Sequence, residues 1–96
     1  MIPHWYIFTY DVSNRRRWRA VFKRLGRVGT PIQKSVFLCR LMPAHCRVLS
    51  AELTRRLDPT TDRLAVADLG PAVGGTNALD VAMGPQVDSG PRVVIV

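Results

Sequence analysis

The first strongly patterned stretch of the chain is HWYIFTYDV, residues 4–12, which is built of aromatic and β-branched side chains and so predicts a strand. Alternation divides it into two faces, one with Tyr6, Phe8, Tyr10 and Val12 and the other with Trp5, Ile7, Thr9 and Asp11. Both faces are largely apolar, whereas a chain of 96 residues has enough helix to cover only one of them. The second face therefore predicts an interface, most simply with another copy of the chain.

The segment after Ser13 and Asn14, either of which can cap a helix, carries apolar residues at helical spacing. The predicted buried stripe consists of Trp18, Val21, Phe22, Leu25 and Val28. The opposite face is basic and contains Arg15, Arg16, Arg19, Lys23 and Arg27, while Arg17 adds a third arginine to the first turn. Arg15, Arg19, Lys23 and Arg27 follow one another at i, i+4 without an acid, and each such like-charge step costs about 0.2 to 0.5 kcal/mol. This basic column favours a phosphate-facing surface over a merely solvated one.

Weaker patterns complete the chain. Residues 31–42 form a second β-rich stretch, Pro43 opens a second helix with a stripe of Cys46, Leu49, Leu53 and Leu57, and DRLAVADL at 62–69 predicts another strand. The Gly- and Pro-rich segment 70–90 is interrupted by an alternation of Leu79, Val81 and Met83. The apolar terminus PRVVIV should join a sheet edge, its own or a partner's. The bare pattern predicts one domain, a sandwich with both helices on one face of a sheet.

The net charge of +7 changes this picture because it is concentrated. Ten basic side chains and no acid lie between Val12 and Ala51. A polyanion relieves such self-repulsion, so nucleic acid is the expected partner, with a solvated basic surface as the alternative. No apolar run is long enough to cross a membrane and no signal peptide is visible, which predicts a cytoplasmic protein. Cys39 and Cys46 lack zinc-ligand spacing and are expected to be reduced packing residues.

Several residues then match a known family in order: Tyr10-Asp11-Val12-Ser13, a basic first helix, Gly29, the run Gln33-Lys34-Ser35-Val36-Phe37, and Asp62. Over residues 6–69 the chain resembles the Cas-two family of CRISPR-associated proteins. The resemblance implies an α+β, ferredoxin-like βαββαβ sandwich with an extra C-terminal strand, in which the stretch 31–42 is split near Lys34-Ser35. Residues 1–69 would form the core, and the tail 70–96 would pair its strand, Arg92 to Val96, with the partner's sheet in a homodimer.

The same resemblance implies a function in CRISPR adaptation, the insertion of new spacers together with the Cas-one integrase. Some members are also metal-dependent endonucleases acting on RNA or DNA, and the matching aspartate, Asp11, is then the catalytic metal ligand. One carboxylate is a poor site for Mg²⁺ or Mn²⁺, but a two-fold dimer would supply Asp11 from both protomers. The alternative for Asp11 is a strand-end carboxylate that caps the helix or pairs with Arg15 or Arg16.

The nucleic-acid-binding residues expected from the pattern are Arg15, Arg16, Arg17, Arg19, Lys23 and Arg27. Tyr10 and Phe37 are expected beside the site, although core packing is the alternative for both. Three functions remain open: a Mg²⁺-dependent endonuclease on single-stranded RNA or duplex DNA, a non-catalytic DNA scaffold that bridges Cas-one integrase dimers, and a toxin-like ribonuclease sharing the fold. The tail after Gly70 is the expected integrase contact.

Overall fold

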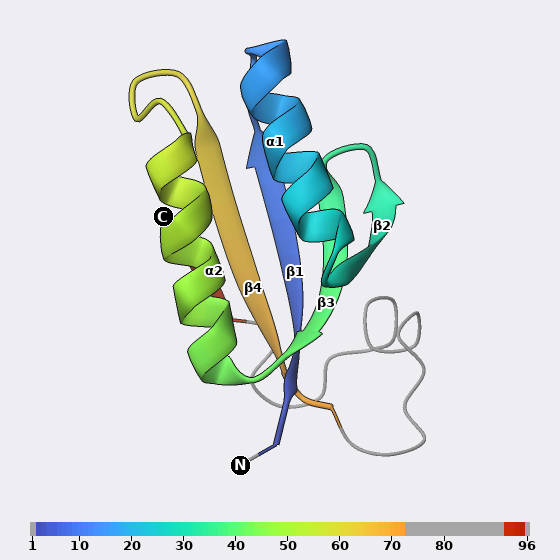
Figure 1. Ribbon diagram of the computed structural model, residues 1–96. Helices are drawn as coiled ribbons and strands as arrows, with labels where there is room; N and C mark the ends of the chain where they lie inside the picture. The colour runs from blue at the N-terminus through green and yellow to red at the C-terminus, as the bar shows by residue number, and fades with distance from the viewer. Residues whose placement is uncertain (1, 73–91, 96) are drawn as a thin grey trace.

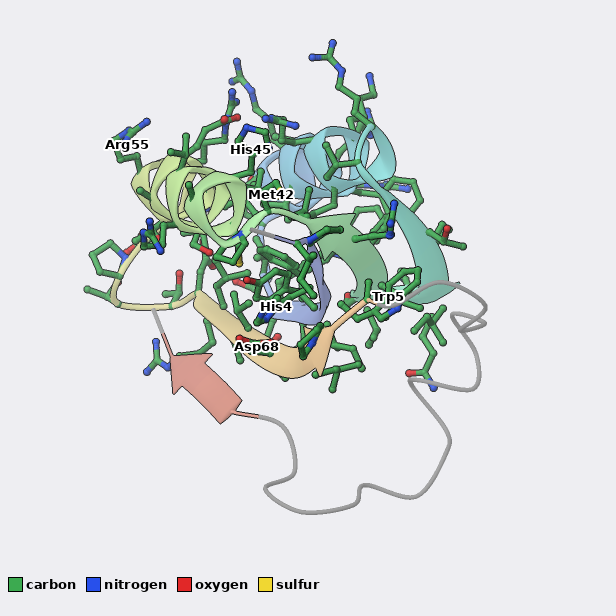
Figure 2. All side chains as sticks on the ribbon, turned by 90° about the horizontal axis from the view of Figure 1, so that it is seen from below. His4, Trp5, Met42, His45, Arg55 and Asp68 are labelled. Atoms are coloured by element: carbon green, nitrogen blue, oxygen red, sulfur yellow. The ribbon has the colours of Figure 1, made fainter. Side chains whose placement is uncertain are left out.

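The architecture follows the predicted order of elements. The structure is a computed structural model that describes residues 2–72 and the backbone of 92–95. Its elements are β1 (His4–Asp11), α1 (Arg15–Gly26), β2 (Gly29–Gln33), β3 (Val36–Leu41), α2 (Pro43–Arg56), β4 (Arg63–Pro71) and β5 (Arg92–Ile95). The strands form an antiparallel sheet in the order β2-β3-β1-β4-β5, and both helices lie on one face of it (Figures 1 and 2). The first six elements form the predicted ferredoxin-like sandwich.

The two faces of β1 differ as the alternation predicts. Tyr6, Phe8 and Tyr10 are buried beneath the helices, whereas Trp5, Ile7 and Thr9 on the other face are half-buried. Among the described side chains, the largest fully buried ones in the core between sheet and helices come from β1, α1, β3, α2 and β4. They are Phe8, Val21, Leu25, Phe37, Cys39, Leu53 and Leu64. The helices thus cover one apolar face of the sheet and leave the other uncovered, as expected for a chain of this length.

The stretch 31–42, which the pattern alone presents as one strand, is two strands, and that single-strand interpretation is wrong. β2 and β3 pair antiparallel on either side of a turn at Lys34 and Ser35. Two distant aromatic side chains hold this turn: the Trp18 Nε1 donates to Ser35 Oγ at 3.1 Å, and the Tyr10 hydroxyl donates to the Lys34 carbonyl at 3.2 Å. The split that the family resemblance implies is therefore confirmed.

The last core strand continues past the predicted end at residue 69. Its register against β1 shifts between Trp5 and Tyr6, and Gly70 adopts a φ of 98°, which suits glycine. Asp68 fixes this bend, since its Oδ1 accepts from the Gly70 N–H at 2.8 Å and lies 2.9 Å from the His4 Nδ1; Figure 2 labels His4 and Asp68. β4 consequently reaches Pro71, two residues beyond the expected boundary.

Of the predicted tail after residue 72, the structure describes only the strand β5. β5 pairs with β4 of the same chain, for example Val93 with Ala67. The apolar terminus thus joins a sheet edge of its own chain. The pairing with a partner's sheet that the family resemblance implies stays a prediction. The strand-like alternation of Leu79, Val81 and Met83 and the tail surface expected to contact an integrase lie outside the described residues.

Gly29 allows a close approach of β2 to β3 and gives a test of the packing. A Cβ at this position would overlap the Cys39 Sγ and lie 2.8 Å from the Leu38 carbonyl oxygen. We expect Gly29→Ala to destabilise the protein by about 1 to 3 kcal/mol, because both neighbours are buried and one is backbone. The matched control is Gly26→Ala, where nothing lies within 4 Å, and helix propensity predicts a neutral or slightly stabilising effect. Urea unfolding of both variants checks this, and equal stabilities would contradict the close approach.

Candidate nucleic-acid interface

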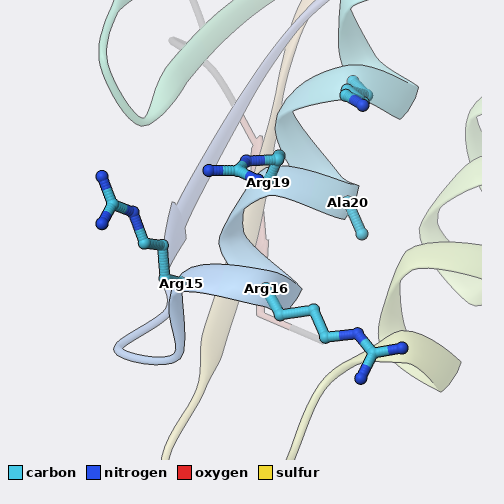
Figure 3. Close-up of a pocket in the computed structure, with 5 residues that line it drawn as sticks. Arg15, Arg16, Arg19 and Ala20 are labelled. Atoms are coloured by element: carbon cyan, nitrogen blue, oxygen red, sulfur yellow. The ribbon is translucent and has the colours of Figure 1, made fainter.

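Helix α1 presents its basic residues on an exposed surface. The helix begins after Asn14, whose Oδ1 accepts from the Arg17 N–H at 2.9 Å, so Asn14 is the cap. Figure 3 shows Arg15 and Arg19 extending to one side of α1 and Arg16 to the other. Lys23 lines the same shallow surface, and Arg27 follows directly at the C-cap; all five side chains are exposed. The i, i+4 column predicted from the sequence is present on the folded chain.

The basic column has no counter-ion among the described residues. Within residues 2–72, ion pairs below 4 Å join Arg17 to Asp62, and Arg24 and Arg56 to Glu52, while the His4 Nδ1 lies 2.9 Å from Asp68 Oδ1. None of the side chains of the column takes part in them. Its charges are therefore solvated and available to a polyanion.

Arg17 is placed differently from its neighbours in the sequence. Its Nε donates to Asp62 Oδ2 at 2.8 Å, and the Asp62 side chain is fully buried. Asp62 also accepts from the Asp58 N–H at 2.9 Å and the Thr61 hydroxyl at 3.1 Å. The hydrogen bond from Arg17 lowers the pKa of the Asp62 carboxyl below its ordinary value. Arg17 thus fastens the first turn of α1 to the loop before β4, and its guanidinium is engaged within the fold.

Asp11 lies at the carboxyl end of β1, where its side chain is exposed. It forms no ion pair below 4 Å within the described part of the chain, and Asn14 rather than Asp11 caps α1. Its register partner on β4, Arg63, donates instead to the Asp62 carbonyl at 2.9 Å. The carboxylate is therefore free to bind an external cation.

Two cavities meet at Asp11. One, of about 440 Å³, lies toward α1 and is lined by Asp11, Val12, Ser13, Arg15, Trp18, Arg19, Lys34 and Ser35. The other, of about 420 Å³, is lined by Thr9, Tyr10, Asp11, Ser35, Val36, Arg63, Leu64 and Ala65. Asp11 and Ser35 line both, so a strand of nucleic acid crossing Asp11 could extend into either.

The described residues of one chain do not complete a divalent metal site. Among the described residues, no three His, Cys, Asp or Glu side chains gather closely enough to hold a metal ion. The described residues that line the two cavities beside Asp11 include no second carboxylate. Since Mg²⁺ takes six oxygen ligands, commonly with one or two carboxylates, Asp11 needs ligands from the substrate, water or a second protomer.

Of the other expected site residues, Tyr10 is buried but lines one of the two cavities beside Asp11, whereas Phe37 and the two cysteines are buried and line neither. Burial raises the pKa of the Tyr10 hydroxyl to about 12, and this hydroxyl donates to the Lys34 carbonyl. Phe37 is fully buried, with its ring 6.4 Å from that of Tyr10 and 5.4 Å from that of Phe22. Tyr10 therefore holds the β2–β3 turn, and Phe37 packs beside it in the core. Cys39 and Cys46 are buried free thiols, and burial raises the pKa of both.

These features define a class: a small, basic, ferredoxin-like domain with an exposed carboxylate beside a cationic helix. Residues 4–72 match the model of the family described as CRISPR associated protein Cas2, and the chain belongs to this family, the Cas-two family that its sequence resembles. No helix in residues 2–72 is long and apolar enough to span a membrane.

Individual relatives agree with this assignment. The chain is 39% identical to the CRISPR-associated endoribonuclease Cas2 of Geobacter sulfurreducens, over 74% of this chain and 75% of the relative. It is also 39% identical to CRISPR-associated endoribonuclease Cas2 1 of Rhodospirillum rubrum, over 72% and 68%. Among solved structures, Streptococcus pyogenes Cas2 at pH 6.5 has a TM-score of 0.59 at 34% identity, covering 62% of this chain and 78% of that one. A hypothetical protein from Thermus thermophilus has a TM-score of 0.64 at 27% identity, covering 78% and 88%.

Proposed function

We propose that this chain acts in CRISPR adaptation as a homodimeric, metal-dependent endonuclease that binds nucleic acid through α1 and cleaves it at Asp11. The observation that carries the proposal is an exposed carboxylate without an ion-pair partner, bordered by Arg15 and Arg19, which also lack one in residues 2–72. The curated relatives are named endoribonucleases, which supports a phosphodiester substrate. Such a protein would work in the cytoplasm.

The dimer is proposed from the face of the sheet that the two helices do not cover. Trp5, Ile7 and Thr9 are half-buried there, and the apolar cavity beside Asp11 opens between β1, β3 and β4. A second copy covering this face would remove apolar surface from water and bring a second Asp11 to the axis. Two carboxylates facing each other would complete a site that one chain leaves incomplete.

At such a site the two Asp11 carboxylates would hold Mg²⁺ or Mn²⁺. When bound, the ion would polarise the scissile phosphate and lower the pKa of a water molecule. Arg15 and Arg19 would hold the phosphates on the α1 side in the orientation that in-line attack requires. Neither cavity contains a His or Glu that could serve as general base, so the carboxylates of Asp11 would also orient the attacking water.

The second candidate is a non-catalytic scaffold that clamps duplex DNA and bridges two Cas-one integrase dimers. The scaffold is favoured because Asp11 is the only carboxylate among the described residues at the candidate site. One carboxylate from each chain is few for a metal-dependent nuclease. The basic column serves both candidates equally. Metal-dependent cleavage separates them.

Binding through α1 gives a direct prediction. We expect Arg19→Ala/Lys23→Ala to weaken binding of duplex DNA of any sequence and to lower the slope of log Kd against log salt concentration by about 1.8 units, since each lost phosphate contact removes about 0.9. The matched control is Arg47→Ala/Arg55→Ala, which removes two exposed cations from α2, neither of them in an ion pair within residues 2–72. Fluorescence anisotropy between 50 and 200 mM salt measures both. If log Kd has the same slope against log salt concentration for the two double variants, α1 does not contact the phosphates of the DNA.

A further inference from the structure

The turn between β2 and β3 adds a cation to the cavity beside Asp11. Lys34 is exposed, and its Nζ lies 5.6 Å from the centre of the Trp18 ring, where the ring attracts a cation. The turn itself is held at both residues, by the Tyr10 hydroxyl on the Lys34 carbonyl and by the Trp18 Nε1 on Ser35 Oγ. The Tyr10 N–H also donates to the Ser35 carbonyl at 3.1 Å. The position of Lys34 is therefore set by rigid neighbours rather than by an open loop.

The cavity that Lys34 shares with α1 is cationic on two sides. Arg15 and Arg19 enter it from the helix and Lys34 from the turn, whereas Asp11 is the only acid among the described residues that line it. None of the three cations forms an ion pair below 4 Å in the described part of the chain. Its volume of about 440 Å³ equals roughly fifteen water molecules, which leaves room for a phosphodiester with its sugar. The hydroxyls of Ser13 and Ser35 add neutral donors to the lining.

We propose that this cavity is a phosphate subsite for the nucleotide next to the scissile bond, and that Lys34 is its positioning residue. The proposal rests on the proposed function, since it takes the scissile phosphate to lie at Asp11. A strand crossing Asp11 toward α1 enters this cavity with its neighbouring phosphate. Arg15 and Arg19 can each donate two hydrogen bonds to that phosphate, and Lys34 adds a point charge from the opposite wall. A phosphate held between the helix and the turn fixes the direction in which the strand passes Asp11.

The test is the salt dependence of binding to a fluorescein-labelled single-stranded RNA of 20 nucleotides, measured by anisotropy with Lys34→Gln. Glutamine keeps most of the stem against Trp18 and removes the charge. We expect Kd to rise about tenfold and the slope against log salt concentration to fall by about 0.7, the value for one contact on a single strand. Arg47→Gln, which removes an exposed charge on α2, should leave the slope unchanged. Lys34→Arg should restore the wild-type slope.

Three other results would overturn the phosphate subsite, and only one of them would also overturn the proposed function. An unchanged slope for Lys34→Gln, with a lowered slope for Arg19→Ala/Lys23→Ala, overturns the subsite and leaves the proposed function standing. Salt-independent or absent binding by the wild type overturns both. A lowered slope that Lys34→Arg fails to restore, together with a lowered melting temperature, overturns the subsite as well, because Lys34 would then act by holding the turn.

Discussion

Replacing Asp11 by Asn is expected to lower Mg²⁺-dependent cleavage of single-stranded RNA by about 10³-fold or more. The substitution keeps the size of the side chain but removes the negative charge that would bind the ion, and a lost metal ligand removes several kcal/mol of transition-state stabilisation. The fold should persist, because Asp11 is exposed and forms no ion pair within residues 2–72. Cleavage rates of labelled RNA and duplex DNA, with Mg²⁺ and with EDTA, measure the effect.

Asp68→Asn is the matched control for this experiment. Asp68 lies beside His4 at the opposite end of β1, and an asparagine can still accept the hydrogen bond from the Gly70 N–H. It should cleave at the wild-type rate. If the Asp11→Asn variant cleaves at the wild-type rate, or if cleavage persists in EDTA, Asp11 is not a catalytic metal ligand.

The largest expected loss of stability comes from Asp62→Ala, at about 3 kcal/mol. This substitution leaves Arg17 without its partner and the Asp58 N–H without its acceptor, and breaking a buried ion pair costs more than the pair contributes. For a domain of this size the melting temperature should fall by roughly 12 to 24 °C. Denaturant unfolding gives the free energy directly.

The comparison variant for Asp62 is Glu52→Ala. Glu52 bonds Arg24 at 2.7 Å, but about a quarter of each of these side chains is exposed, so solvent weakens this pair and the expected loss is below about 1 kcal/mol. A loss at Asp62 no larger than the loss at Glu52 would show that Arg17 is not fixed by the fold. Arg17 would then be as available to nucleic acid as Arg15 and Arg16.

Stability should also fall in acid because of Asp62. The Arg17 hydrogen bond lowers the pKa of this carboxyl in the folded protein, so its contribution is complete above the ordinary aspartate pKa of about 3.9. The contribution is lost as pH decreases from there through the lowered folded-state value. Urea unfolding between pH 2 and pH 6 should show a shallower acid-side decline for Asp62→Asn than for the wild type. Parallel pH profiles would contradict the lowered pKa.

Local sequence signals predict the elements whose determinants lie close together in the chain. The alternation along β1, the apolar stripe of α1 and the cap at Asn14 all involve neighbours within one or two turns, and the structure confirms them. The β2–β3 turn cannot be predicted from the local pattern, because distant residues hold it. Trp18 bonds Ser35, 17 residues away, and Tyr10 bonds Lys34, 24 residues away. At the centre of this β-rich stretch Ser35 is the only local turn signal, and it is a weak one without a glycine or asparagine beside it.

In the candidate site, too, features that depend on one element can be predicted from sequence, whereas those that depend on distant residues cannot. Asp11 at a strand end and the i, i+4 column can be located from sequence, since both depend on the period of one element. Three consecutive arginines look alike in the sequence, and only the fold brings Asp62, 45 residues away, to Arg17 alone. The local sequence does not place Lys34 beside Asp11, because its position in the cavity depends on the turn that Trp18 holds. The one available signal was its position beside Ser35 within the family motif.

We propose that two copies of Asp11 form one site, and a heterodimer with one wild-type and one Asp11→Asn chain distinguishes a shared site from two independent ones. Two different affinity tags on co-expressed chains allow its purification, and light scattering verifies that it is a dimer. A shared site predicts that the heterodimer cleaves RNA no faster than the Asp11→Asn homodimer, because one carboxylate leaves the ion under-coordinated. Half of the wild-type rate, a monomeric wild-type protein, or no Mg²⁺-dependent cleavage by the wild-type dimer would contradict the claim.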